Sequence, residues 1–149
     1  MFGREKAAAL VAEFVGAFVL ASAVLAMVGR TSFPFFAAMA ASLAMTGMTL
    51  AFGSASGGYY NPAITVAAWT VRRLETARAL VYIAAQMLGG VVAWTLNQWL
   101  LGTTLKNIAN TTFDWRVFTA EAVGTAVFAM ILIKLWTLLI RQMTASIQQ

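Results

Sequence analysis

The stretch SGGYYNPAIT, residues 56–65, interrupts an otherwise apolar sequence with glycines, tyrosines and an Asn-Pro pair. Asn is a favoured N-cap residue, and Pro is favoured as the first helical residue because the N–H it lacks would be unpaired there anyway. Asn61 and Pro62 therefore predict the start of a helix. The residues that follow, Ala63–Arg72, are enough for a helix of only about three turns.

Four long apolar stretches surround this segment. Of 149 residues, 61% are hydrophobic and 10% are charged, which excludes an ordinary soluble domain. Each stretch has about 20 residues or more, enough to cross a hydrocarbon core of about 30 Å as a helix. We therefore predict an all-α membrane protein that forms one domain over residues 1–149. The predicted spans are approximately 7–28, 33–52, 77–101 and 118–140.

The segment 53–72 lies between the second and third spans and is too short to contribute a span of its own. Residues 53–60 contain three glycines and two serines and are predicted to be a loop. Non-helical backbone is tolerated inside a membrane only where it is buried in protein or lines a watery cavity. We therefore predict a re-entrant loop followed by a half-helix. Near mid-membrane, the N-terminus of this half-helix would repel cations and donate hydrogen bonds to a neutral oxygen.

The basic residues lie at the edges of the spans. With a net charge of +5 the chain could suggest a nucleic-acid partner, but this placement is typical of contacts with lipid headgroups. Six edge residues fall on one side of the predicted membrane and three on the other, so both termini are expected to be cytoplasmic. The six are Arg4, Lys6, Arg72, Arg73, Arg78 and Arg141, and the three are Arg30, Lys106 and Arg116.

The composition argues against catalysis and against a metal or cofactor site. The sequence has no Cys, no His and only five acidic residues. It therefore lacks thiolate or imidazole metal ligands, and no nucleophile or general acid–base pair can be recognised. We expect no catalytic residues, no metal, no cofactor and no nucleic-acid partner.

The segment 56–65 resembles the first pore loop of the aquaporin and glycerol-facilitator family, whose signature is Ser-Gly-x-His-x-Asn-Pro-Ala-Val-Thr. Tyr59 stands at the position of the usual His, and Ile64 at that of the Val. Residues 12–16 (AEFVG) are similar to the family's first helix, and residues 82–90 (YIAAQMLGG) to its third. The similarity covers nearly the whole chain.

The resemblance implies a role for particular residues. Asn61, Pro62 and Ala63 would form the motif at the centre of the pore, and Glu13 and Gln86 would support its loop. Counting twenty residues back from Asn61 places the family's filter position of the second helix at Ala41. The family usually has an aromatic residue there, so the outer constriction of the pore is expected to be wide. Carbonyl groups on the cytoplasmic side of Asn61 would form a polar track, from Gly57, Gly58, Tyr59 and Tyr60.

Residues 12–21 and 120–129 are identical at six of ten positions. Three predicted spans separate the starts of the two copies, so the second copy runs in the opposite sense, as in an inverted repeat. Glu121 is then the counterpart of Glu13 and would support a loop of the second repeat. Alternatively, Glu121 lies near a helix start and extends to the interface beside Arg116.

The family's second Asn-Pro-Ala motif and the Arg after it do not occur in these residues. Three explanations stay open: a fragment of a longer aquaporin, a half-channel that assembles with a partner, or a structural subunit of a larger complex. The leading prediction is an aquaporin-like channel for water or small neutral solutes, its pore completed by other chains or by missing sequence. The alternative is a non-conducting accessory subunit. The expected partners are membrane lipids and other membrane chains, in a homo-oligomer or a larger complex.

Overall fold

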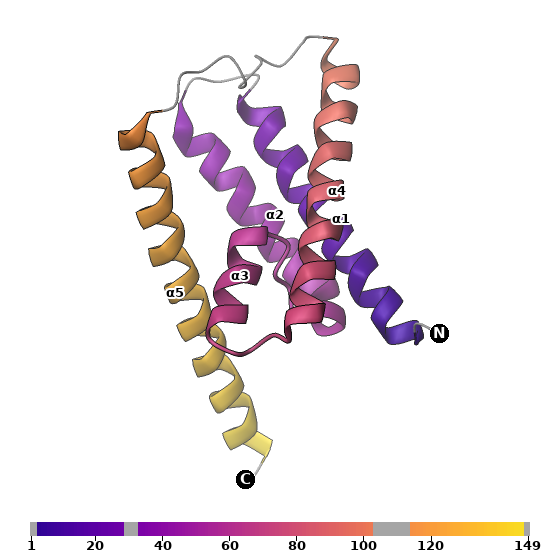
Figure 1. The fold of residues 1–149 in the computed structure, drawn as a ribbon, viewed down its shortest axis with the longest axis vertical. Helices are drawn as coiled ribbons and strands as arrows, with labels where there is room; N and C mark the ends of the chain where they lie inside the picture. Colours follow the sequence, from indigo (N-terminus) through magenta and orange to yellow (C-terminus); the bar gives the residue numbers. More distant parts are fainter. Residues whose placement is uncertain (1–2, 29–32, 103–113, 148–149) are drawn as a thin grey trace.

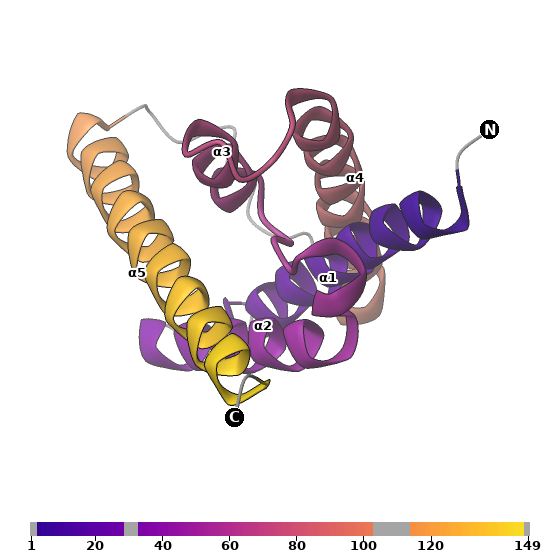
Figure 2. The ribbon, with the colours of Figure 1, turned by 90° about the horizontal axis from the view of Figure 1, so that it is seen from below.

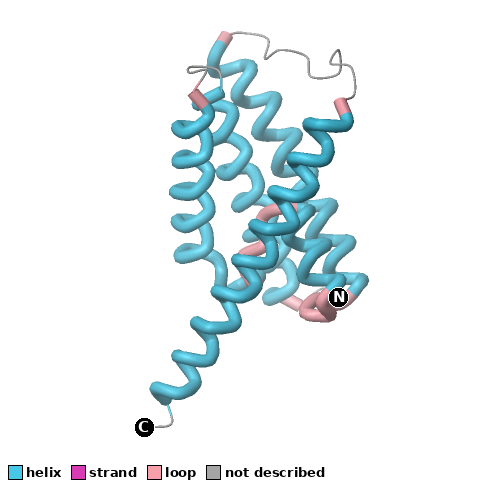
Figure 3. The backbone as a smooth tube through the Cα atoms, turned by 90° about the vertical axis from the view of Figure 1, so that its left-hand side faces the viewer, coloured by secondary structure: helices cyan, strands magenta, loops and turns pink. Residues whose placement is uncertain are grey.

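The computed structural model of the chain describes residues 3–28, 33–102 and 114–147, and all regular structure in these residues is helical (Figure 3). There are four long helices and one short one. Their bounds are Arg4–Val28 (α1), Pro34–Ser56 (α2), Pro62–Thr70 (α3), Thr76–Leu101 (α4) and Trp115–Ile147 (α5).

The long helices run up and down in a bundle that is more than one layer deep (Figures 1 and 2), and α3 lies among their lower halves. The loop after α2 turns back into the bundle, so α3 begins at about mid-height. Helix α3 then runs back to the end of the bundle at which α2 ended. Helix α1 packs against both α2 and α4, whereas α3 lies between α4 and α5 (Figure 2). This is the all-α arrangement with a half-length helix that the sequence predicts.

Helix α2 continues further than predicted. Residues 53–56 belong to its last turn and not to the loop, so the predicted start of the loop at residue 53 is wrong. The helix ends where Gly57 adopts the left-handed conformation (φ 102°) and its N–H donates to the Gly53 carbonyl (2.9 Å). A glycine in this conformation is a common helix C-terminus because it has no Cβ to clash. The loop therefore spans only residues 57–61.

Among the residues that the structure describes, three helices are long and apolar enough to cross a membrane, namely α1, residues Phe35–Ser56 of α2, and α4. Large apolar side chains on their outer faces are exposed, among them Leu43, Leu50 and Leu88, as suits contact with lipid. In α5 the described apolar stretch is Phe118–Phe128. The fourth span, predicted at 118–140, lies partly outside the described side chains and stays a prediction.

Close approach of α1 and α4 depends on a glycine. A Cβ at Gly89 would lie 2.5 Å from the Phe14 carbonyl oxygen and 3.1 Å from the Phe18 nitrogen, both backbone atoms of α1. Ala12, Ala17 and Ala93 are buried nearby in the same pair of helices. Small residues are typical of membrane helix pairs because they let the two backbones pack closely. This contact fixes the distance between the helices that carry Glu13 and Gln86.

Candidate functional site

The carboxylate group of Glu13 joins α1 to the loop before α3. Its side chain is fully buried, and it accepts hydrogen bonds from the backbone N–H groups of Tyr59 (to Oε1, 3.1 Å) and Tyr60 (to Oε2, 2.6 Å). Gln86 Nε2, on α4, donates to Glu13 Oε2 (2.6 Å) and lies 2.8 Å from Thr65 Oγ1 on α3. One acidic side chain therefore connects α1, the loop and α4, and Gln86 extends the connection to α3.

In the loop 57–60 the backbone N–H groups are hydrogen-bonded within the protein, whereas the backbone carbonyl groups are not bonded to any described residue. All four backbone N–H groups donate within the protein: Gly57 to the Gly53 carbonyl, Gly58 to the Ser56 hydroxyl, and Tyr59 and Tyr60 to Glu13. The four backbone carbonyl groups accept no hydrogen bond from any residue that the structure describes. These four groups are therefore acceptors that water or another polar molecule can use.

The side chain of Tyr60 anchors the loop to the bundle, a role that the sequence analysis missed. Tyr60 is 1% exposed and has a left-handed backbone (φ 49°). Its ring lies against Gly16 of α1, where any Cβ would overlap the ring, and its hydroxyl donates to the Met48 carbonyl of α2 (2.9 Å). From α4, the Tyr82 hydroxyl donates to the Ser56 carbonyl (3.2 Å). In the sequence, the absence of a side chain at Gly16 was the one signal of its contact with the Tyr60 ring.

Asn61 is the N-cap of α3, as predicted. Its backbone is extended, and its Oδ1 accepts from the Ala63 N–H (2.8 Å), so that Pro62 is the first helical residue. The Thr65 N–H donates to the Asn61 carbonyl (2.9 Å). No described residue accepts from the Nδ2 group of Asn61. With Oδ1 occupied by the cap, Nδ2 is the part of the side chain left to donate to a ligand.

A groove of about 860 Å³ runs past the N-terminus of α3. Asn61, Pro62 and Gln86 lie in its wall together with Ala41 of α2. The structure thus brings the predicted filter position to the same groove as Asn61 and Pro62 of the predicted pore motif. Tyr60 also lies in this wall, whereas Gly57, Gly58, Tyr59 and Ala63 do not. Most of the remaining wall is apolar and comes from α1, α2 and α4, including Leu20, Val24, Met45, Met87, Val91 and Trp94.

Glu121, the predicted counterpart of Glu13, lies apart from this site. Its side chain is exposed on α5 and makes no hydrogen bond or ion pair with any described residue. Neither Glu121 nor Arg116 lies in the wall of the groove, although Phe128 of the same helix does. Of the predicted site residues, Glu121 alone is exposed, and it makes no hydrogen bond to the Glu13 network.

Comparison with known proteins identifies the family. The family model described as Major intrinsic protein matches residues 3–147, nearly the whole chain. The chain belongs to the major intrinsic protein family. With three helices apolar enough to span a membrane, this member of the family is an integral, multi-pass membrane protein. It contacts lipid along these helices.

Relatives within the family include both glycerol facilitators and aquaporins by name. The chain is 35% identical over 130 residues to glycerol uptake facilitator protein-like 6 of Lactiplantibacillus plantarum, which covers 82% of this chain and 60% of the relative. It is 33% identical over 91 residues to aquaporin Z of Photorhabdus laumondii, covering 56% of this chain and 39% of the relative. To bovine aquaporin-4 it is 46% identical over 50 residues, or 34% and 16% of the two chains. The matches thus span 60% or less of each of these relatives.

Proposed function

We propose that the chain forms one wall of a channel for passive transport of water and small neutral solutes. The observation that carries this proposal is the loop 57–60, in which every N–H is paired within the protein and every carbonyl is free of described partners. A row of acceptors at fixed positions replaces the hydrogen bonds that a solute loses when it leaves bulk water. Asn61 Nδ2 adds a donor at the end of this row.

Electrostatics favour a neutral solute. The N-terminus of α3 carries roughly half a positive charge, which repels a cation as it reaches Asn61. The apolar walls of the groove offer an ion no substitute for its hydration shell. Water or a polyol can both accept from Asn61 Nδ2 and donate to the loop carbonyls, so we propose that such molecules pass in single file.

Ala41 bears on which neutral solutes pass. Its side chain is a single methyl group in the wall of the groove. An aromatic side chain there would extend into the groove and narrow it at this level, so we propose that the constriction admits polyols of glycerol size as well as water. The remaining wall is proposed to come from residues outside these 149, whether in the same polypeptide or in a neighbouring chain.

Osmotic swelling of vesicles that contain the protein tests this proposal. Asn61→Asp keeps an oxygen that can cap α3 but replaces the Nδ2 donor with negative charge. We expect water and glycerol flux to fall at least about tenfold, since the loss of one preorganised donor in an enzyme costs about 100–1,000-fold. Gln98→Glu, which makes the same kind of change near the end of α4 and outside the groove, should leave flux within about twofold of the wild type.

Two outcomes would contradict the proposal. One is flux that Asn61→Asp leaves unchanged, because the pore would then run elsewhere. The other is the absence of flux from folded wild-type protein in the same vesicles, which would favour a structural subunit that does not conduct.

The orientation of the chain is a separate proposal. We propose that Arg72, Arg73 and Arg78 face the cytoplasm with both termini, because six of nine edge charges lie on that side. A membrane-impermeant thiol reagent applied from outside should modify a Cys placed at Asn110 and spare one placed at Glu75. Since the natural sequence has no Cys, each variant carries a single thiol. The reverse labelling pattern would show that the chain is inserted in the opposite direction.

A further inference from the structure

A second cavity, of about 500 Å³, lies at the end of the bundle where α1 and α4 begin. Its wall includes the first turn of α1, the last turn of α2 at Ala55 and the start of α4. It shares no residue with the groove at Asn61. The channel mechanism proposed above therefore makes no use of it.

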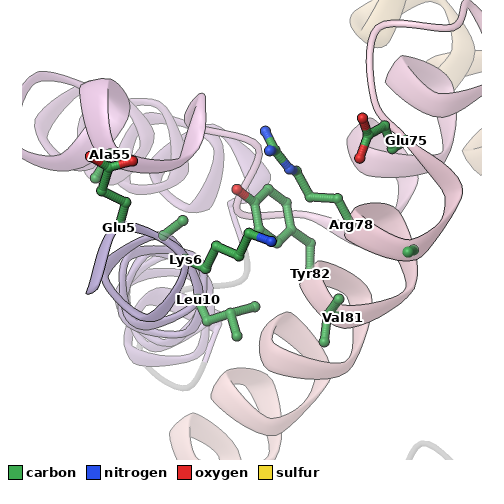
Figure 4. Close-up of a pocket in the computed structure, with 10 residues that line it drawn as sticks. Glu5, Lys6, Leu10, Ala55, Glu75, Arg78, Val81 and Tyr82 are labelled. Carbon is green, nitrogen blue, oxygen red and sulfur yellow. The ribbon is translucent and has the colours of Figure 1, made fainter. Parts of the chain in front are cut away.

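The cavity carries two positive and two negative groups in an ordered arrangement. In Figure 4 the ammonium group of Lys6 and the guanidinium group of Arg78 extend toward the ring of Tyr82, whereas the carboxylate groups of Glu5 and Glu75 lie at the two outer sides. None of these four side chains makes a hydrogen bond or an ion pair with a described residue. Opposite charges that share a cavity without pairing leave both signs available to a ligand that carries both.

The depth of the cavity suits the polar end of a lipid. Lys6 and Arg78 lie in the first turns of two helices that are long and apolar enough to span a membrane, so both lie near the level of the headgroups. Leu10 and Val81, one turn further along α1 and α4, make the wall apolar toward the membrane interior. A ligand with a charged end and an apolar end fits this order of groups.

We propose that this cavity binds the headgroup of a zwitterionic phospholipid that carries a primary ammonium group, as phosphatidylethanolamine does. The phosphate would lie between Lys6 and Arg78, where it accepts charge-assisted hydrogen bonds from both. The ammonium group would donate to Glu5 or Glu75 at the rim, and the glycerol and acyl chains would follow Leu10 and Val81 into the membrane. The four lining charges sum to zero, as the headgroup charges do. An anionic headgroup would leave both carboxylates unpaired.

Binding should bridge α1, α2 and α4, so it can be measured as thermal stabilisation of the full chain in detergent during titration with short-chain lipids. We expect phosphatidylethanolamine to stabilise at a lower concentration than phosphatidylcholine, whose quaternary ammonium group has no N–H to donate, and than phosphatidylglycerol. Replacing both Lys6→Gln and Arg78→Gln should raise the apparent Kd by about 20-fold, on the basis of roughly fivefold per basic residue.

Three controls make the result specific. Arg4→Gln with Arg72→Gln removes the same charge on the same side but outside the cavity, and should change the Kd by less than about twofold. Lys6→Arg with Arg78→Lys keeps the charge and should keep binding, which separates loss of the site from misfolding. Glu5→Gln with Glu75→Gln should remove the preference for ethanolamine over choline and leave phosphate-dependent binding.

Other outcomes would overturn the proposal. Equal affinity for all three lipids would show only a general attraction of basic residues to membranes. The same holds if the Lys6/Arg78 variant and the Arg4/Arg72 control variant lose the same amount of lipid affinity. Free phosphoethanolamine should stabilise far less than the lipid. If it binds equally tightly, the apolar wall contributes nothing and the ligand is a soluble phosphate ester.

Discussion

Replacing Glu13 with Ala should lower the free energy of unfolding by about 3–5 kcal/mol, because the N–H groups of Tyr59 and Tyr60 would lose their acceptor and Gln86 would lose one of two partners. Each buried donor left unsatisfied costs about 1–3 kcal/mol. All three donors lie at a carboxylate that is fully buried, so water cannot easily replace it. Unfolding in mixed micelles, followed by circular dichroism, measures the loss.

Glu121→Ala is the matched control, since both residues are the Glu of the same repeated sequence. Its exposed side chain has no partner among the described residues, so we expect a change of less than about 0.5 kcal/mol. The loss of unfolding free energy for Glu13→Gln should lie between those for Glu13→Ala and Glu121→Ala. One oxygen remains as an acceptor, while the new NH₂ group faces existing donors. Similar losses for Glu13→Ala and Glu121→Ala would mean that Glu121 has a strong partner outside the described residues.

Substitution of Gly89 by Ala should cost about 3 kcal/mol, at the upper end of the usual range for overpacking. The added methyl group would lie 2.5 Å from the Phe14 carbonyl oxygen. Because that atom belongs to the backbone of α1, the clash cannot be relieved by a side-chain rotation. The helices would have to move apart, and Gln86, one turn away on α4, would move with them from Glu13. We therefore expect a loss of solute flux together with the loss of stability.

Gly90→Ala tests whether this effect comes from the helix contact or from glycine itself. No atom lies within 4 Å of a Cβ at position 90, apart from the neighbouring residues and the backbone of its own helix. Ala is also the better helix former by roughly 0.5–1 kcal/mol. Gly90→Ala should therefore be neutral or slightly stabilising when both variants are unfolded in mixed micelles and followed by circular dichroism. If both substitutions destabilise alike, close approach at Gly89 is not what holds α1 to α4.

Much of the fold follows from short-range features of the sequence. Apolar stretches of about span length predict long membrane helices because lipid offers the backbone no hydrogen bonds. Asn61 and Pro62 predict the start of α3 because the cap is made by the residue itself, through its own side chain and the N–H two residues later. The end of α2 was harder to predict, since residues 53–56 are compatible with either loop or helix and the left-handed turn at Gly57 decides between them.

The pairing of Glu13 with the loop depends on residues 46 and 47 positions apart, and its link to Gln86 on residues 73 positions apart. Family resemblance pointed to these partners, but spacing along the chain could not, because it does not say which faces of α1 and α4 meet. The same is true of Tyr60, whose ring fits Gly16 only when the two backbones pack closely. The sequence by itself determined where α3 begins and that this short helix lies between two long apolar helices. The tertiary structure alone decided which buried donors find an acceptor, because the Glu13 carboxylate reaches the loop N–H groups only once α1 packs beside the loop.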